Sequence, residues 1–300
     1  MENIYYLNGK YIPESEAKIS VRDRGVRHGD AVFDTERTFN GKIFKLRKHL
    51  ERFYRSLHFT RIDPGVTIDE LEKITLEVVR RNESIRPQNG DYWVTQLVTR
   101  GMSSDVSEPG PATVCVKCYP ITFEGYADLY DTGAHVVFPI TRRDSPQSLD
   151  PKVKHISRLN LVMAELEAKQ VDPRAQAVML DLDGNISETV GGNVFVVTKG
   201  VIKYPSSRNL LEGVSRETIV EMAKSLGIPT KECVLQPYEV YTADEVFLTT
   251  TSFCIMPVSK INGNPLAAKV PGSITKQLTA SWSELVGMDI VQQAQSHLKI

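Results

Sequence analysis

The sequence predicts an α/β (α+β) fold in two domains. Apolar residues alternate over some short stretches, as in strands, and recur at helical spacing over others. The chain of 300 residues is long enough for two domains. Between Pro120 and Gly133 both patterns give way to Pro, Gly, Asp and Tyr. We therefore expect a small N-terminal domain over residues 1–119, a linker over 120–133 and a larger C-terminal domain over 134–300.

The N-terminal domain is expected to start with hairpins. Residues 4–11 alternate around an Asn-Gly dipeptide, and a second Asn-Gly interrupts residues 31–46, which predicts two tight turns between strands. Thr67 and Glu70 have the spacing of a capping box, so they are expected to open a helix. The other elements expected here are a helix at 47–59, the end of the second helix near 81–82, and strands at 92–99 and 112–119.

The C-terminal domain is expected to mix strands and helices in sequence. Its first strand begins at Ala134, and Gly227 closes a predicted helix at the position where glycine is favoured. The expected elements are strands at 134–138, 175–182, 194–198, 201–204 and 245–249, and helices at 157–169, 215–226 and 273–285.

Composition and charge exclude several classes of function. The net charge is −1 and basic residues are interspersed with acidic ones, so we expect no nucleic-acid partner. No stretch approaches the roughly 20 apolar residues of a membrane span, and the N-terminus has no basic region followed by an apolar run. We therefore expect a cytoplasmic protein with no membrane partner.

Two cysteines have the spacing of a zinc or redox pair. Cys115 and Cys118 lie in a predicted strand, where residues three apart point to opposite faces, and no second pair follows at ligand spacing. We therefore expect buried thiols in a reducing compartment, and no metal site.

Lys154 and Glu188 carry the most information about function. A lysine that can form an imine and a carboxylate that can hold a pyridinium nitrogen protonated are what pyridoxal phosphate chemistry requires. Each residue has an ordinary alternative as a solvated surface side chain. Lys152 is a nearby competitor for the lysine role. Two glycines and an asparagine follow Glu188, where backbone can approach a cofactor closely.

Seven motifs in order give the chain a family resemblance. It resembles the class IV (fold-type IV) pyridoxal-phosphate aminotransferases, a family that includes branched-chain and D-amino-acid aminotransferases, (R)-selective amine transaminases and aminodeoxychorismate lyase. The resemblance covers nearly the whole length and implies the two-domain fold of D-amino-acid aminotransferase, with the cofactor between the domains. The motifs lie at residues 21–30, 49–52, 153–160, 186–188, 211–216, 244–251 and 255–258.

The resemblance implies roles for particular residues. Lys154 would bind the cofactor covalently and carry the substrate proton, Glu188 would bond to the pyridine nitrogen, and Arg52 would bind the phosphate. The remaining cofactor contacts implied are Leu211 against the ring and Val214, Ser215, Thr250 and Thr251 around the phosphate. Ser215 also has an alternative as a helix N-cap.

One residue of the branched-chain pattern is missing. Branched-chain aminotransferases carry a tyrosine five residues after the lysine, bonded to the phenolic oxygen of the cofactor. This chain has Leu159 there and Asn160 next. Which group polarises that oxygen is left open.

Substrate choice is ambiguous in the sequence. Phe33 and Arg37 match the branched-chain pattern in part, whereas the arginine of its Tyr-x-Arg motif is replaced after Tyr92 and Trp93. The Arg-x-His motif with which D-amino-acid aminotransferases bind a carboxylate is absent after residues 99–101. The candidate substrate residues are Arg37 and Arg100 for a carboxylate, and Phe33, Tyr92, Trp93 and Ser252 for the rest of the substrate. Structural roles for the arginines and aromatic residues are equally open.

The resemblance implies transfer of an amino group from an amino acid, branched-chain or otherwise hydrophobic, or an amine, to a 2-oxo acid. The cofactor would be pyridoxal 5′-phosphate and the assembly a homodimer or larger. The alternatives are an (R)-selective amine or D-amino-acid transaminase, a lyase of the aminodeoxychorismate type, and a non-catalytic binding protein. The loop at 101–111 is a candidate specificity element because it is long and rich in Ser, Pro and Gly.

Overall fold

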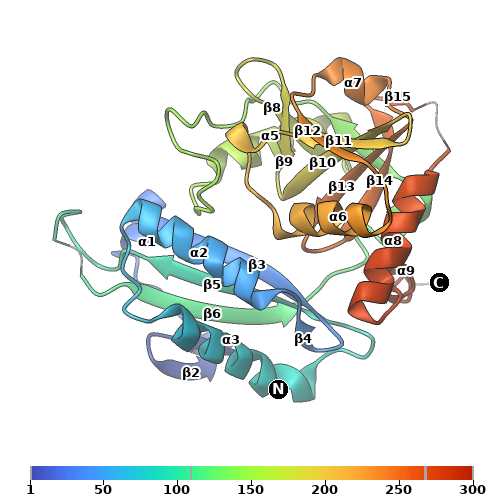
Figure 1. Ribbon diagram of the computed structural model, residues 1–300. Coiled ribbons are helices and arrows are strands. Elements are labelled where there is room, and N and C mark those ends of the chain that lie inside the picture. Colours follow the sequence, from blue (N-terminus) through green and yellow to red (C-terminus); the bar gives the residue numbers. More distant parts are fainter. Residues whose placement is uncertain (1, 109, 267–268, 299–300) are drawn as a thin grey trace. The chain divides into compact units, whose positions relative to one another are not determined.

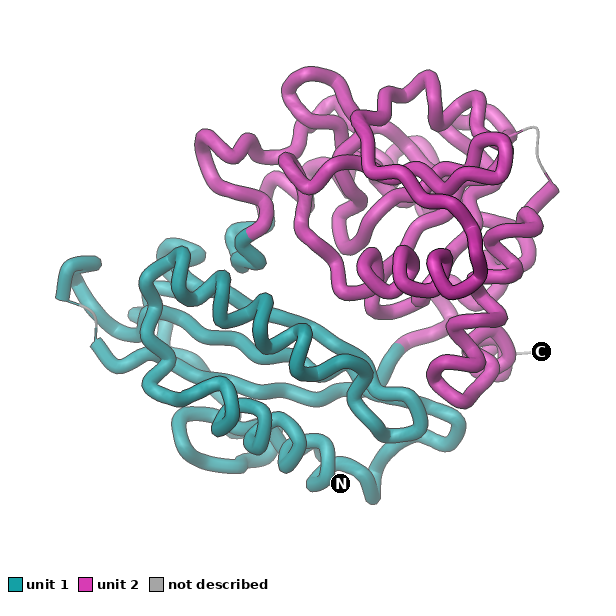
Figure 2. Tube along the Cα trace, viewed as in Figure 1, with its two compact units in different colours: residues 1–121, 153–158 teal, residues 122–152, 159–300 magenta. Residues whose placement is uncertain are grey.

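The computed structural model describes residues 2–108, 110–266 and 269–298 and has the mixed α/β fold expected. It divides into two compact units, coloured separately in Figure 2. Unit 1 contains Met1–Ile121 and Val153–Arg158, and unit 2 contains Thr122–Lys152 and Leu159–Ile300. Residues 122–133, expected as a linker, are grouped with unit 2 and include a short helix, so these divisions differ from the predicted domain limits.

Unit 1 is a six-stranded antiparallel sheet in the order β2-β1-β6-β5-β3-β4. Its strands are β1 (Ile4–Leu7), β2 (Lys10–Pro13), β3 (Ala31–Phe39), β4 (Lys42–Ile43), β5 (Tyr92–Thr99) and β6 (Thr113–Pro120). Its helices are η1 (Glu14–Glu16), α1 (Arg24–His28), α2 (Leu46–Thr60), α3 (Ile68–Asn82) and η2 (Glu83–Ile85). Both expected hairpins form, and Asn8 and Gly9 take the positive φ angles of 47° and 90° that such a turn needs.

Helices α2 and α3 cover one face of this sheet. Phe53 of α2 and Leu71 of α3 belong to the same buried cluster as Val94 and Val116 of the strands. Thr67 and Glu70 form the predicted capping box at the start of α3. Because side chains alternate along a strand, the residues between the buried ones point to the other face. Figure 1 shows α2 lying along β3 and β5.

Unit 2 is built on a nine-stranded mixed sheet in the order β12-β11-β10-β13-β14-β7-β8-β9, with β15 paired to β14. Its strands are β7 (Ala134–Val137), β8 (Gln176–Leu180), β9 (Ile186–Thr189), β10 (Gly192–Thr198), β11 (Val201–Pro205), β12 (Thr230–Cys233), β13 (Glu245–Thr250), β14 (Cys254–Ile261) and β15 (Asn264–Pro265). Its helices are α4 (Leu129–Thr132), α5 (Leu159–Val171), η3 (Ser207–Asn209), α6 (Val214–Ser225), α7 (Pro237–Tyr241), α8 (Ser273–Val286) and α9 (Ile290–Gln295). Figure 1 shows α6 beside α8, and both contact β13.

Strand β14 was not predicted, although it lies inside the sheet between β13 and β7. Its sequence contains Pro257, and proline in a strand interior normally removes a hydrogen bond. Here the pairing with β7 begins at Val258, one residue after the proline, so the missing N–H costs no bond to β7. Strands β9 and β12, of four residues each, were also missed.

The two closely spaced cysteines lie on β6, and both are buried. Three positions of separation place Cys115 and Cys118 on opposite faces of the strand, so they do not converge on one metal ion. Burial raises the pKa of Cys115 to about 11, which disfavours the thiolate that zinc binds. Among the described residues, no helix combines the length and apolar character that crossing a bilayer requires.

A buried ion pair fastens α2 to β3. Asp34 is fully buried and accepts hydrogen bonds from Arg52 Nε to Oδ2 at 2.8 Å and from Arg52 Nη2 to Oδ1 at 2.6 Å. The His49 ring nitrogen Nδ1 lies 2.9 Å from Asp34 Oδ1. The bidentate geometry uses two edges of a planar guanidinium, which fixes the direction of the arginine side chain.

Burial and neighbouring charges together set the protonation of this cluster. Burial alone would raise the pKa of Asp34, but Arg52 and His49 outweigh it and hold the pKa well below its usual range. Burial lowers the pKa of His49 despite its bond to Asp34, so the ring is neutral at pH 7. The neighbouring Glu36 has its pKa raised by burial, which favours the protonated acid. Asp34, Glu36 and His49 lie close enough to ligate a metal ion, but Arg52 already supplies the positive charge there.

Replacing Asp34→Asn should lower the free energy of unfolding by about 3–5 kcal/mol at pH 7, because the Arg52 charge stays buried without its partner. The folded-state pKa of Asp34 lies below the unfolded value of about 4, so its contribution is present above that pH and is lost as the pH falls. Urea denaturation at pH values from 7 to 3 should therefore find that the free energy of unfolding falls less in the variant than in the wild type.

The matched control is Asp69→Asn, which breaks an ion pair between Asp69 and Arg47 whose side chains are 71% and 47% exposed. Exposed pairs contribute about 1 kcal/mol or less, so this variant should be nearly as stable as the wild type. Equal losses in the two variants would contradict the importance of the buried pair.

Candidate functional site

The backbone around Lys154 is fixed within unit 1. The carbonyl of Lys154 accepts a hydrogen bond from Phe33 N at 2.9 Å, and Ile156 N donates to Ala31 O at 3.1 Å. Lys154 N donates to Ser56 Oγ of α2 at 3.2 Å. The lysine segment therefore runs beside the start of β3 and is attached to α2 as well.

The side chain of Lys154 lies over an aromatic ring. Its Nζ is 4.7 Å from the centroid of Phe33, and the guanidinium carbon of Arg158 is 5.6 Å from the same centroid. Such contacts attract cations to the ring face, so Phe33 directs the amine. The competitor Lys152 has a side chain 41% exposed and an ion pair with Asp150 at 3.3 Å. The geometry therefore favours Lys154 as the reactive amine.

Arg52 and His49 lie in the same unit as Lys154. The positive charge of Lys154 also contributes to the lowered pKa of His49, as the smallest of the effects that act on that ring. A protonated lysine and a guanidinium in one region favour an anionic ligand.

Glu188 is buried in unit 2, on β9. Its Oε1 accepts from Arg143 Nε at 2.7 Å and its Oε2 from the backbone N–H of Leu211 at 3.0 Å. The carboxylate therefore has a fixed orientation and a cation beside it. Sequence reasoning missed Arg143, because it lies 45 residues from Glu188 in a loop that carries no recognisable motif.

The backbone around Leu211 connects Glu188 to the start of a helix. Asn193 Nδ2 donates to Leu211 O at 3.1 Å. A Cβ atom on Gly213 would fall 2.2 Å from Asn193 Oδ1, and one on Gly192 would fall 2.1 Å from the carbonyl oxygen of Thr249. The position of Gly192 therefore requires glycine, and a side chain at Gly213 would displace that of Asn193.

Helix α6 begins at Val214, and its N-cap is Gly213, without a side-chain capping bond. The N-cap role considered for Ser215 is therefore wrong, because Ser215 lies inside the first turn. Amide groups at a helix start have no partners within the helix and favour an anion. The chain from Glu188 through Leu211 to Gly213 thus joins a buried carboxylate to an anion-binding helix end. This combination fits a cofactor with a basic ring nitrogen and a phosphate.

Thr250 ends β13 opposite Gly192. Its Oγ1 accepts from Ser252 N at 3.1 Å and from Phe253 N at 3.2 Å, so its hydroxyl shapes the turn that follows. Thr251 and Ser252 are half-buried in that turn, and Tyr126 donates to Ser252 O at 3.2 Å. These bonds give Thr250 a structural role beside the one proposed for it toward phosphate.

Three of the candidate substrate residues are engaged in packing. Tyr92 is fully buried and its hydroxyl donates to Asn82 O at 2.9 Å. Arg37 is 3% exposed, donates to Thr38 O and stacks with its guanidinium carbon 4.1 Å from the Phe39 centroid.

The third of these residues, Arg100, holds both carboxylate oxygens of Asp30 at 2.9 and 3.0 Å. It also donates to the carbonyl groups of Thr60 and Arg61. These contacts favour the structural alternatives that the sequence left open.

Phe33 and Trp93 lie on the face of the unit 1 sheet opposite to α2 and α3 and are both half-buried. Leu97 pairs with Phe33 across the strands, and Trp93 contacts Tyr119 with the rings tilted and their centroids 5.5 Å apart. Leu159 begins α5 and is 74% exposed, and Asn160 Nδ2 donates to Arg142 O at 2.6 Å. An aliphatic side chain has no group that could bond to a phenolic oxygen.

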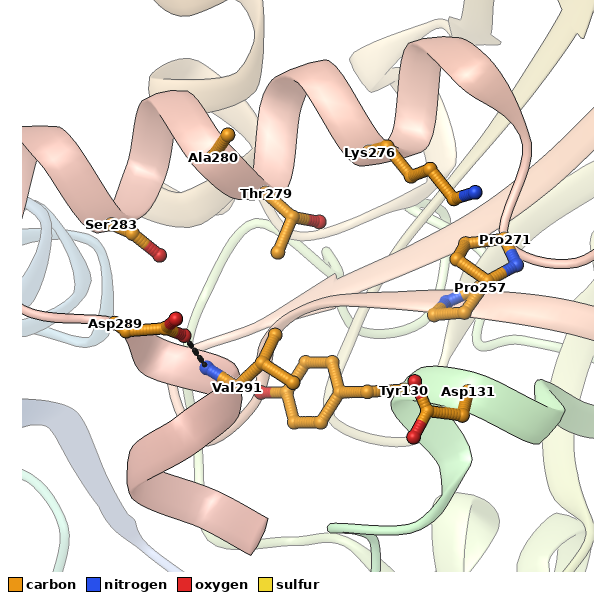
Figure 3. A pocket seen from close by; sticks show the side chains of 10 residues that line it. All are labelled: Tyr130, Asp131, Pro257, Pro271, Lys276, Thr279, Ala280, Ser283, Asp289 and Val291. Atoms are coloured by element: carbon orange, nitrogen blue, oxygen red, sulfur yellow. Dashed lines mark hydrogen bonds between the residues drawn. The ribbon is translucent and has the colours of Figure 1, made fainter.

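A separate pocket of about 460 Å³ lies in unit 2 at α8 and α9 (Figure 3). Thr279 and Ser283 of α8 point toward it, and Tyr130 and Val291 face them (Figure 3). None of the residues predicted for the site lines this pocket. The candidate site is therefore defined by its hydrogen bonds and not by this pocket.

Known proteins give an independent comparison. Residues 31–261 match the family described as amino-transferase class IV. A putative branched-chain-amino-acid aminotransferase of Methanocaldococcus jannaschii is 34% identical over 93% of this chain and 95% of its own length. A D-alanine aminotransferase of Staphylococcus epidermidis is 30% identical over 94% of this chain and 97% of its own length.

A solved structure extends the comparison to the fold. The branched-chain amino acid aminotransferase of T.th., crystallised with pyridoxamine 5′-phosphate, superposes with a TM-score of 0.87. It shares 28% of its residues with this chain and covers 95% of this chain and 94% of its own. Sequence motifs, fold and comparisons agree, and the chain belongs to the class IV aminotransferase family.

Proposed function

We propose that this chain transfers the amino group of a branched-chain or other hydrophobic amino acid to a 2-oxo acid, with pyridoxal 5′-phosphate as its cofactor. The observation that carries the proposal is the placement of Lys154, whose backbone is bonded to β3 and α2 and whose amine lies 4.7 Å over the Phe33 ring. The chain is a transaminase by its class IV family and by its branched-chain and D-alanine aminotransferase relatives.

Pyridoxal 5′-phosphate, when bound, supplies an aldehyde that captures amines and a ring that accepts electrons from the bound substrate. Lys154 Nζ would hold the aldehyde carbon until the incoming amine replaces it. The released lysine amine would then carry a proton between the substrate carbon and the former aldehyde carbon of the cofactor. Glu188, ionised beside Arg143, would hold a proton at the ring nitrogen. Leu211 would pack against the ring, since its backbone is fixed at Glu188 and Asn193.

The phosphate would lie at the start of α6. The amide groups of Val214 and Ser215 and the positive end of the helix dipole favour an anion there. Arg52 would add a charge-assisted bond from a guanidinium already fixed by Asp34, and Thr251 a hydroxyl. A prepositioned arginine loses less side-chain entropy when it binds.

Hydrophobic donors fit the open face of the unit 1 sheet. Phe33, Leu97 and Trp93 offer apolar surface there, and Thr35 Oγ1 and Thr95 Oγ1 are bonded to each other at 3.0 Å. Arg37 and Arg100 are held by partners within unit 1, so neither is proposed to receive the carboxylate of a dicarboxylic donor. The loop at 101–111 remains our candidate for a specificity element.

A homodimer is supported by the outer face of α5. Leu161, Ala164 and Ala168 are buried against β7 and β8, while the opposite side of the helix carries a second apolar stripe. This stripe, Leu159, Val162, Met163 and Leu166, is 43–74% exposed. Such spacing on a helix forms a continuous apolar surface, which is typical of an interface.

No described cysteine forms a disulfide, which suits the reducing cytoplasm where we place the enzyme.

Lys154→Ala should lower the transamination rate by at least about 10³-fold, because it removes both the covalent attachment and the proton carrier. Borohydride reduction of the wild type followed by peptide mass analysis should find the cofactor on the Lys154 peptide. Lys152→Ala is the matched control and should keep the label and the activity. Label on a different lysine would refute the assignment.

Donor preference can be measured from the spectral change of the cofactor when amines are added singly to the purified enzyme. L-leucine, L-isoleucine and L-valine should convert it fastest, because the open face of the unit 1 sheet offers apolar surface to the substrate side chain. D-alanine and (R)-1-phenylethylamine test the two alternative transaminase activities. A clear preference for either would overturn the substrate proposal, while leaving the aminotransferase assignment in place.

Leu166→Glu should weaken the dimer, since it places a charge in the apolar stripe of α5. Sedimentation equilibrium should find a dimer for the wild type and a lower average mass for the variant. Leu285→Glu on α8 is the control, because Leu285 is 53% exposed and Leu166 is 51% exposed. A monomeric wild type, or a variant that dimerises as strongly as the wild type, would contradict the proposal.

A further inference from the structure

The ion pair between Arg143 and Glu188 is buried on both sides. Arg143 Nε donates to Glu188 Oε1 at 2.7 Å, and the two side chains are only 4% and 5% exposed. The second carboxylate oxygen accepts from Leu211 N at 3.0 Å. Each oxygen of the carboxylate thus receives a hydrogen bond from a donor in a fixed direction.

Arg143 lies in a loop but is bonded to the unit 2 sheet. Its backbone N–H donates to the carbonyl of Leu180 at 2.9 Å, and Leu180 pairs with Ile186 two residues before Glu188 on β9. Its Nη1 donates to Asp144 Oδ2 at 2.9 Å. The guanidinium is therefore anchored through its backbone and through a second carboxylate, so it stays aligned with Glu188 when a ligand arrives.

Charge explains why an arginine is needed there. Removal of a carboxylate from water favours its protonated form unless a cation lies against it. A neutral Glu188 could not balance the charge of a protonated ring nitrogen. Arginine stays charged at neutral pH because its pKa is about 12 or higher, and its planar donor group fits one carboxylate edge.

We infer that Arg143 is a positioning residue that keeps Glu188 ionised and aimed, so that the cofactor's ring nitrogen stays protonated. The inference rests on the proposed role of Glu188. It adds a residue that acts through Glu188 and does not itself touch the cofactor. The neighbouring Arg142 is a matched control, because it is an arginine of the same loop whose Nη1 donates to the carbonyls of Pro139 and Ile140.

The experiment follows the ring nitrogen directly. Wild type and variants are loaded with pyridoxal 5′-phosphate labelled with ¹⁵N in the ring, and the ¹⁵N chemical shift is read at pH 7. Arg143→Gln should move the resonance from the protonated to the unprotonated position. The amino-transfer half-reaction should slow by about tenfold or more, as when a partner that orients a binding group is lost. Arg142→Gln, the matched control, should leave the resonance in place.

Further variants separate the possible outcomes. Arg143→Lys keeps a positive charge and should keep the nitrogen protonated, and it serves as the test if Arg143→Gln does not fold. An unchanged resonance in folded Arg143→Gln, or an unprotonated nitrogen in folded Arg143→Lys, would overturn the inference. Glu188→Gln should give the unprotonated resonance. If the resonance of Glu188→Gln stays in the protonated position, the proposed role of Glu188 fails. If the resonance moves in Glu188→Gln but not in Arg143→Gln, only the role of Arg143 fails.

Discussion

A cation lying against a carboxylate helps it keep its charge when it is removed from water, and each unit of this protein has such a pair among the residues of the candidate site. In unit 1 Asp34 pairs with Arg52, and in unit 2 Glu188 pairs with Arg143. The first pair orients a cation on α2, and the second orients an anion on β9. Every role assigned to the site depends on these charges being present and fixed before any ligand binds.

The backbone completes this arrangement. Lys154 is attached to a strand and a helix, and its amine is directed by Phe33. Gly213 allows α6 to begin close to Asn193, which places a helix N-terminus in the same hydrogen-bonded chain as Glu188. A cofactor with an aldehyde, a basic nitrogen and a phosphate needs an amine, a carboxylate and an anion-binding helix end. The chain supplies the carboxylate on β9, the helix end at α6, and the amine on a segment bonded to β3 and α2.

Local patterns in the sequence predicted much of the fold, because turns, caps and periodicity are local. Strand β14 escaped prediction because it contains Pro257, which is tolerated here since the pairing with β7 begins only at Val258. The order of motifs identified Lys154 and Glu188, since the family spacing survives in this chain. It could not identify Arg143, whose partner is distant in sequence, nor decide whether Arg100 binds a substrate or a neighbouring carboxylate. Those answers depend on packing, which no local pattern records.

We propose that Lys154 and Glu188 serve the same cofactor ring. A crystal structure of the protein with pyridoxal 5′-phosphate tests it most directly. We expect continuous electron density from the side chain of Lys154 to the cofactor, with the ring nitrogen within hydrogen-bond distance of Glu188. Density joined to a different lysine, or a ring nitrogen facing a group other than Glu188, would contradict the account.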